Sequence, residues 1–248
     1  FCNLYFIFLY FILFCNLYFI FFCYNIKFVV YLKLLFYKIK IIMNFSKIKF
    51  IHNIPNAPNV NIWVDNAPLI SKVAYKTISP YICMAPGEHI LQVYTESETK
   101  TPLFDYDIKL EDHKDYTIIM TGDLTDRNNL HITVYDDLVQ APGTGNTAIR
   151  FINGVIGTTA IDIYNKNIKI LSNVGFDTES PYINFNPSET TFLAITNNNS
   201  LNVLLGPIKL NFASGDIYTL IITGTANNLQ FPMKILLSND TASMCITL

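Results

Sequence analysis

Charged residues are scarce in this chain. Only 15% of its 248 residues are charged, against about 25% in an average domain, while 51% are hydrophobic. Four of the 17 basic residues lie in the first 42 residues, so 13 remain against 19 acidic residues downstream. Proteins bind nucleic acid largely by neutralising phosphates with clustered Lys and Arg. The composition therefore predicts that the protein does not bind nucleic acid.

Cysteine is also rare, and the sequence carries no obvious framework of paired cysteines. Three of the five, Cys2, Cys15 and Cys23, lie near the start of the chain, and the other two are Cys83 and Cys245. They form no CxxC pair and no Cys/His cluster with the spacing of a zinc site. We therefore expect buried or merely surviving thiols, no disulfide framework and no bound metal.

Motifs of catalysis and cofactor binding are absent as well. The sequence contains no HExxH, no GxSxG and no glycine-rich phosphate loop. His89, His113 and His131 have no second histidine two or four residues away. The acidic clusters lack the glycine turn of a calcium-binding loop. The sequence therefore predicts a protein that is not an enzyme and needs no cofactor.

An internal duplication is the clearest positive feature. The segment SPYI at 79–82 recurs identically at 180–183, and YTIIMTG at 116–122 returns as YTLIITG at 218–224. An offset of 101 to 102 residues is far longer than a solenoid repeat, so it indicates a duplicated domain. Apolar alternations, prolines and turn glycines are kept, whereas most polar residues differ. The duplication therefore informs on the fold more than on function.

Each repeat has the pattern of a β-sandwich. Apolar and polar residues alternate over 59–65, 89–94 and 115–120, which predicts strands with one face in a core and the other in water. Turn residues separate such runs at spacings of about 8–12 residues, as in antiparallel sandwiches. We expect seven or eight strands per repeat, enough for two packed sheets each.

The predicted fold class is all-β, with two antiparallel Ig-like or prealbumin-like sandwiches in tandem. Repeat 1 should span 43–139 and repeat 2 should span 147–248. Residues 140–146 contain one proline and two glycines but no charged or bulky apolar residue, as expected of a short linker.

Residues 1–42 form an apolar, low-complexity segment. The octapeptide at 1–8 recurs letter for letter at 14–21, and its residues are those of AT-rich codons. The first methionine is Met43, so we expect 1–42 to be absent from the mature protein, which would then be cytosolic or virion-associated. The alternative is a membrane anchor, because about 20 apolar residues can cross a bilayer.

The first repeat resembles a known family. Residues 50–65 read FIHNIPNAPNVNIWVD, which is similar to the HASPDAPAVDVYVDG segment of the tandem domain of unknown function 4397. Residues 79–93 and 115–119 resemble two later segments of that family. The resemblance implies a β-sandwich module, usually of surface or secreted bacterial proteins, with no established activity and no catalytic residue to transfer. Asn56 and Asn61 replace aspartates that are usual in the family.

His52 and Asn56 are candidate site residues in a proline-rich loop at 53–61. His52 could be a ligand or a base at the rim of this loop. More simply, one ring nitrogen could bind a backbone carbonyl and hold the turn. The equivalent residue in repeat 2 is Asn153, which can make a similar hydrogen bond but does not titrate near neutral pH. This replacement favours the structural interpretation.

Trp63 and Tyr94 are candidates for an exposed aromatic surface. Trp63 is out of phase with the apolar positions of its strand, and Tyr164 takes its place in repeat 2. It should therefore either pack against the other domain or form a binding patch, and packing is the favoured interpretation.

The prediction for function is a non-enzymatic structural or interaction module. Its partner would be an unknown protein or a surface glycan, and a membrane only if residues 1–42 are retained. The alternative is a carbohydrate- or small-ligand-binding protein that uses the loop 53–61 with Trp63.

Overall fold

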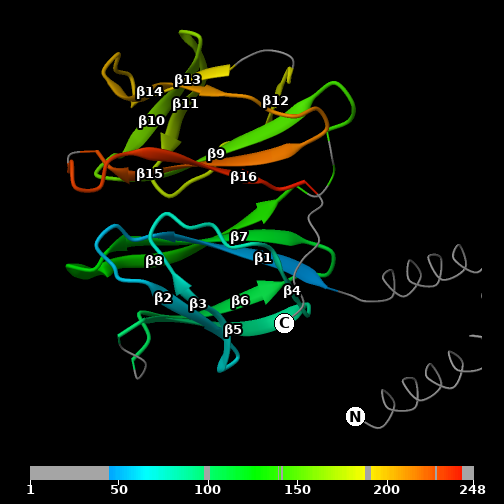
Figure 1. The fold of residues 1–248 in the computed structure, drawn as a ribbon, viewed down its shortest axis with the longest axis vertical. Coiled ribbons are helices and arrows are strands. Elements are labelled where there is room, and N and C mark those ends of the chain that lie inside the picture. Colours follow the sequence, from blue (N-terminus) through cyan, green and yellow to red (C-terminus); the bar gives the residue numbers. More distant parts are fainter. Residues whose placement is uncertain are drawn as a thin grey trace, which may run out of the picture. The chain divides into compact units, whose positions relative to one another are not determined.

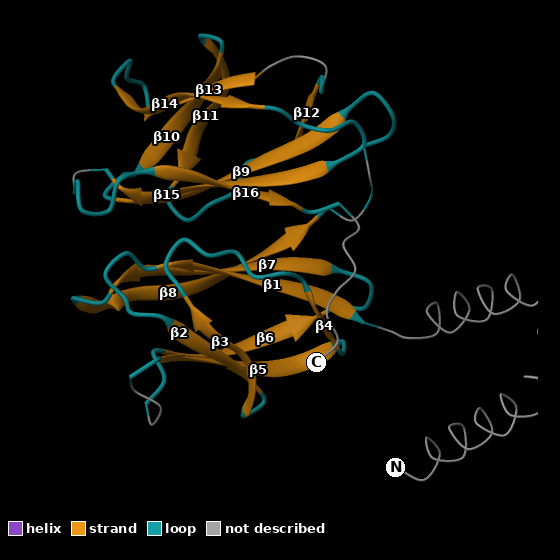
Figure 2. Cartoon of the chain, viewed as in Figure 1, coloured by secondary structure: helices purple, strands orange, loops and turns teal. Residues whose placement is uncertain are grey.

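The computed structural model describes residues 45–97, 101–138, 140, 142–187, 191–226 and 228–241. The predictions for residues 1–42 therefore lie outside the described residues. The described part contains strands, turns and loops but no helix (Figure 2). It follows that no helix able to cross a membrane occurs among these residues.

Repeat 1 is a sandwich of two four-stranded sheets (Figure 1). Its described strands are β1 (Ser46–Asn53), β2 (Val60–Val64), β3 (Ala67–Val73), β4 (Ile82–Met84), β5 (Gly87–Thr95), β6 (Phe104–Leu110), β7 (Asp115–Asp123) and β8 (Asp126–Asp137). We call β4-β1-β7-β8 the inner sheet and β3-β2-β5-β6 the outer sheet. The pairing is antiparallel except between β1 and β7, which run parallel.

Repeat 2 has the same topology. Its described strands are β9 (Thr147–Ile156), β10 (Ala160–Asn165), β11 (Ile168–Gly175), β12 (Ile183–Phe185), β13 (Thr191–Asn197), β14 (Val203–Leu210), β15 (Ile217–Thr225) and β16 (Lys234–Asn239). Its inner sheet is β12-β9-β15-β16, with β9 and β15 parallel, and its outer sheet is β11-β10-β13-β14. The all-β class and the two tandem sandwiches are confirmed.

The outer sheet of repeat 1 follows the alternation that the sequence predicts. Val60, Ile62 and Val64 of β2 are buried in the core, and the residues between them are half-buried. The next turn, Asp65-Asn66, has φ of 52° and 62°, which Asp and Asn tolerate better than other side chains and which suits a tight β-hairpin. This hairpin sets the register of β3 on β2.

The inner sheets do not follow the predicted alternation. In β7, every residue from Asp115 to Gly122 is buried, so the prediction that one face of 115–120 meets water is wrong. The reason is that the second face packs on the other repeat. A separate core cluster joins the inner sheets of both repeats through Ile51, Ile119, Tyr135, Ile152, Ile221 and Leu236. Both repeats therefore belong to one compact unit that begins at Phe45.

Cys83 corrects the expectation of free thiols. It lies on β4 and is disulfide-bonded, while the other four cysteines lie outside the described residues. Cysteine spacing did not predict this bond, because the two partners of a disulfide are brought together by the fold and not by their distance in sequence.

Candidate functional site

His52 is a structural residue of its loop. It is fully buried, and its Nδ1 accepts a hydrogen bond from the Ile54 N–H at 3.3 Å. Its Nε2 lies 3.2 Å from the Pro58 carbonyl oxygen, to which it donates. Burial lowers the pKa of His52, so the neutral ring is favoured. With both nitrogens engaged, His52 is not available as a ligand or a base.

Asn56 also serves the loop itself. Its Nδ2 donates to Asp123 Oδ1 at 2.5 Å, and its Oδ1 accepts from the Leu124 N–H at 3.1 Å. These bonds tie the loop 53–61 to the β7–β8 hairpin. At the far end of the loop, Asn61 Oδ1 accepts from the Lys72 N–H at 3.0 Å. The amides that replace the family's usual aspartates are therefore occupied by bonds within the repeat.

Trp63 and Tyr94 form an aromatic pair on the outer sheet. Their ring centroids are 5.7 Å apart at an angle of 65°, an edge-to-face arrangement, and both side chains are half-buried. The contact between repeats is made by the inner sheets, so Trp63 does not lie there and the packing interpretation fails. Gln92 is the register partner of Trp63, and its buried Oε1 accepts no hydrogen bond within the described structure.

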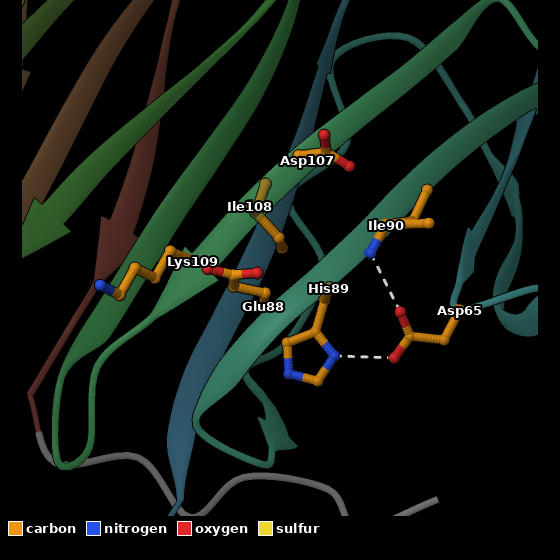
Figure 3. Close-up of a pocket in the computed structure, with 7 residues that line it drawn as sticks. All are labelled: Asp65, Glu88, His89, Ile90, Asp107, Ile108 and Lys109. Atoms are coloured by element: carbon orange, nitrogen blue, oxygen red, sulfur yellow. Dashed lines mark hydrogen bonds and ion pairs between the residues drawn. The ribbon is translucent and has the colours of Figure 1, made fainter.

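An open depression is formed by the turn after β2 and by β5 and β6, two strands of the same outer sheet (Figure 3). It has a volume of about 570 Å³ and is lined by Asp65, Glu88, His89, Ile90, Asp107, Ile108 and Lys109. His89 Nδ1 lies 2.7 Å from Asp65 Oδ2, and its Nε2 lies 2.8 Å from the Ala85 carbonyl oxygen. The bond to His89 lowers the pKa of Asp65. Both ring nitrogens of His89 are therefore engaged by groups of its own repeat.

A cluster of buried charges lies between the repeats, and the sequence motifs did not identify it. Arg150 of β9 is fully buried and pairs with Asp137 of β8, and Lys49 of β1 pairs with Asp240, just after β16. Arg150 also binds Glu179 through Nη1 at 2.6 Å. Sequence held one signal, because a basic residue recurs at the same place in both repeats within an apolar strand.

Hydroxyl groups and aromatic rings complete this cluster. Thr117 Oγ1 donates to Asp137 Oδ1 at 2.7 Å, and Tyr81 OH donates to Asp137 Oδ2 at 2.5 Å. The Lys49 ammonium lies 4.7 Å from the centre of the Tyr81 ring. Burial, followed by the charge of Asp137, raises the pKa of Tyr81, so this hydroxyl stays protonated. The side chains of Lys49, Asp137, Arg150 and Asp240 are closed to solvent, and Glu179 is exposed at the edge of the cluster. The buried pairs therefore hold the repeats together instead of forming a reactive site.

No group of three or more His, Cys, Asp and Glu side chains in the described part of the chain is arranged to hold a metal ion.

The sequence matches the family described as domain of unknown function (DUF4397) over residues 46–164 and 149–244. The chain belongs to the DUF4397 family. The chain matches no curated protein sequence. Among solved structures, this DUF4397 chain is similar to "CBMbc (family CBM26) from Eubacterium rectale Amy13K in Complex with Maltoheptaose". The identity is 12% and the TM-score 0.26, with 80% of this chain and 98% of the other covered. A likeness this weak says nothing of function.

Proposed function

We propose that this DUF4397 protein is a non-enzymatic interaction module. Two repeats form one rigid scaffold, and the outer sheet of repeat 1 contacts a partner. The observation that carries the proposal is the half-buried pair of Trp63 and Tyr94 on this sheet, whose strands β5 and β6 also line an open depression. Trp and Tyr are enriched at the centres of protein interfaces.

The surroundings of the pair support a protein partner. Next to the aromatic rings, β6 presents the exposed side chains Asp105, Asp107 and Lys109. An aromatic centre with a charged rim is the usual composition of a protein–protein contact. Catalysis is less well supported, because His52 and His89 have both ring nitrogens engaged.

A glycan is the second candidate partner. An aromatic ring can stack on a sugar face, and the unpartnered Gln92 Oε1 could accept a bond from a sugar hydroxyl. Of the ligand site predicted from the sequence, this candidate retains Trp63 but not the loop 53–61, whose polar side chains are already hydrogen-bonded. The glycan would instead contact the outer sheet.

The test places a photo-crosslinking amino acid at Asp105, the register partner of Gln92. The matched control places it at Lys209, which is exposed on β14 of the outer sheet of repeat 2. We expect a discrete protein adduct from position 105, lost in the double variant Trp63→Ala, Tyr94→Ala and retained in Tyr164→Ala. A glycan array with the same variants tests the second candidate.

Two results would contradict the proposal. Equal adducts from positions 105 and 209 would show that contact is not specific to repeat 1. If the protein adduct and the glycan signal are both unchanged in the Trp63→Ala, Tyr94→Ala double variant, the aromatic pair is not part of a binding site. The thermal unfolding of each variant must match that of the parent, which we expect because both rings are half-buried on a solvent face.

A further inference from the structure

The contact between the inner sheets is reciprocal. Lys49 and Arg150 are equivalent residues of the two repeats, as are Asp137 and Asp240, each at the end of its edge strand. Lys49 of repeat 1 pairs with Asp240 of repeat 2, and Arg150 of repeat 2 pairs with Asp137 of repeat 1. When residue i contacts j and the equivalent of j contacts the equivalent of i, the surfaces are related by a two-fold axis.

The loops around the contact follow the same symmetry. Tyr75 and Phe176 are equivalent residues. Tyr75 packs edge-to-face on Phe231 at 6.0 Å, and Phe176 packs edge-to-face on His131 at 6.1 Å. Each repeat therefore offers one aromatic residue to the β7–β8 or β15–β16 hairpin of the other. A surface of this kind could in principle pair with a second copy of itself.

One pair of equivalent residues breaks the symmetry. Asn53, at the end of β1, donates from Nδ2 to the Gly154 carbonyl oxygen at 2.8 Å. Gly154 is also the residue of repeat 2 that corresponds to Asn53 in repeat 1. A Cβ atom at Gly154 would lie 2.5 Å from Asn53 Nδ2, closer than packed atoms approach. The Asn53 side chain therefore occupies space that a side chain at position 154 would enter, so a larger residue at 154 would displace it.

Two equivalent threonines differ in their hydrogen bonding in the same way. Thr223 donates its hydroxyl to Asn53 Oδ1. Its equivalent, Thr121, has a buried Oγ1 with no hydrogen-bond partner among the described residues. Under the two-fold axis, the partner of Thr121 would be a side chain at position 154, which is glycine. The unpaired hydroxyl is thus the counterpart of the missing asparagine, and it independently supports the two-fold geometry.

We propose that the inner sheet of repeat 1 is a pairing surface that selects the inner sheet of repeat 2 over another repeat 1, and that Asn53 and Gly154 make the selection. Two repeat-1 faces would bring two Asn53 side chains together near the axis. Two repeat-2 faces would leave Gly154 opposite Gly154, with both Thr223 hydroxyls unpaired. The charges do not discriminate, because every combination pairs one basic residue with one aspartate.

The experiment inserts a protease site between the exposed residues Gly143 and Thr144 of the full chain. After cleavage, native mass spectrometry distinguishes mixed complexes from complexes of identical fragments by mass. For the parent sequence we expect the mixed one-to-one complex and no pair of first fragments. Dissociation of the cleaved chain, or pairs of first fragments as abundant as mixed complexes, would overturn the proposal.

Exchange of the two residues tests the selection itself. Gly154→Asn should weaken association of the cleaved fragments at least about ten-fold, because two side chains then compete for one space. Asn53→Gly together with Gly154→Asn should restore it to within about three-fold, because Asn at 154 can reach the Thr121 hydroxyl. If Gly154→Asn alone does not fold, recovery of a folded, associated chain in the double variant is the readout. A double variant no better than Gly154→Asn contradicts the proposal, and Lys114→Ala, at an exposed ion pair, is the control.

Discussion

At equivalent positions of their first strands, the two repeats carry different side chains that accept from equivalent N–H groups and donate to carbonyls at different positions. In repeat 1 the ring of His52 accepts from the N–H two residues ahead and donates to a carbonyl. In repeat 2 the amide of Asn153 accepts from the Val155 N–H at 3.1 Å and donates to the Val174 carbonyl at 3.1 Å. The duplication has therefore preserved donors and acceptors at this position and not a titratable group.

Comparison of the two repeats also distinguishes positions that make the same hydrogen bond in both from positions whose side chains differ in chemical character. Asn61 and Asp162 each accept from a backbone N–H eleven residues later, at 3.0 and 2.9 Å. On the outer sheets, by contrast, the Trp63–Tyr94 pair has no full counterpart. Tyr164 replaces Trp63, but by strand register the position of Tyr94 is Thr196. A property confined to one repeat is the better indication of a specialised surface, which is why the proposed contact lies on repeat 1.

The largest test of the comparison removes a buried charge from one repeat. Arg150→Ala leaves Glu179 without its cation and leaves Asp137 only the Lys49 ammonium, which lies 3.7 Å from its Oδ2. Breaking a buried ion pair typically costs about 3–5 kcal/mol. We expect a loss of that size in urea unfolding. Arg150→Lys, which places the repeat-1 residue in repeat 2, should lose less. A loss no larger than that of the exposed variant Lys114→Ala would show that the cluster does not hold the repeats together.

A second test exchanges the residues that hold the turn. His52→Ala should destabilise the protein by about 1–3 kcal/mol, because a buried N–H and a carbonyl lose their partner. His52→Asn should cost less, because Asn can bond the Ile54 N–H as Asn153 bonds Val155 in repeat 2. Urea unfolding of both variants checks this order. If His52→Asn costs as much as His52→Ala, the two turns are not equivalent.

The pH dependence of stability distinguishes His52 from its replacement. Burial lowers the pKa of His52 in the folded protein below the ordinary value of 6.5, so below that pH the unfolded chain binds more protons than the folded one. Stability from this group is thus complete above pH 6.5 and falls as the pH drops toward the folded-state pKa. His52→Asn should remove this part of the slope between pH 7 and 5. If the pH dependence of the unfolding free energy is the same in His52→Asn as in the parent, the buried neutral His52 is not its source.

The smallest effects are expected at the equivalent threonines. Thr223→Val removes a hydrogen bond to Asn53 and should cost about 1–2 kcal/mol. Thr121→Val removes a hydroxyl that has no partner in the described structure, so it should be neutral or slightly stabilising. Thermal unfolding of the two variants measures the difference. Equal losses would mean that the environments of the two threonines are symmetric.

Sequence patterns were sufficient for the elements that have one face in water. β2 and β5 appear where alternation places them, because burial on one side requires a period of two residues. The duplication and the family resemblance gave the tandem sandwiches. The candidate site was less predictable: His52 and Asn56 proved to be bonded within their loop, and only the structure showed that Trp63 lies away from the other repeat.

The amino-acid sequence by itself determined that the chain would form two β-sandwiches, because strand periodicity and turn residues act over a few neighbouring positions. The pairing of the sandwiches was decided only in the tertiary structure. Lys49 and Asp240 lie 191 residues apart, and nothing local indicates that one will neutralise the other. Only folding buries Lys49, Asp137, Arg150 and Asp240 between the repeats. Each charge tolerates burial because an opposite charge is buried next to it.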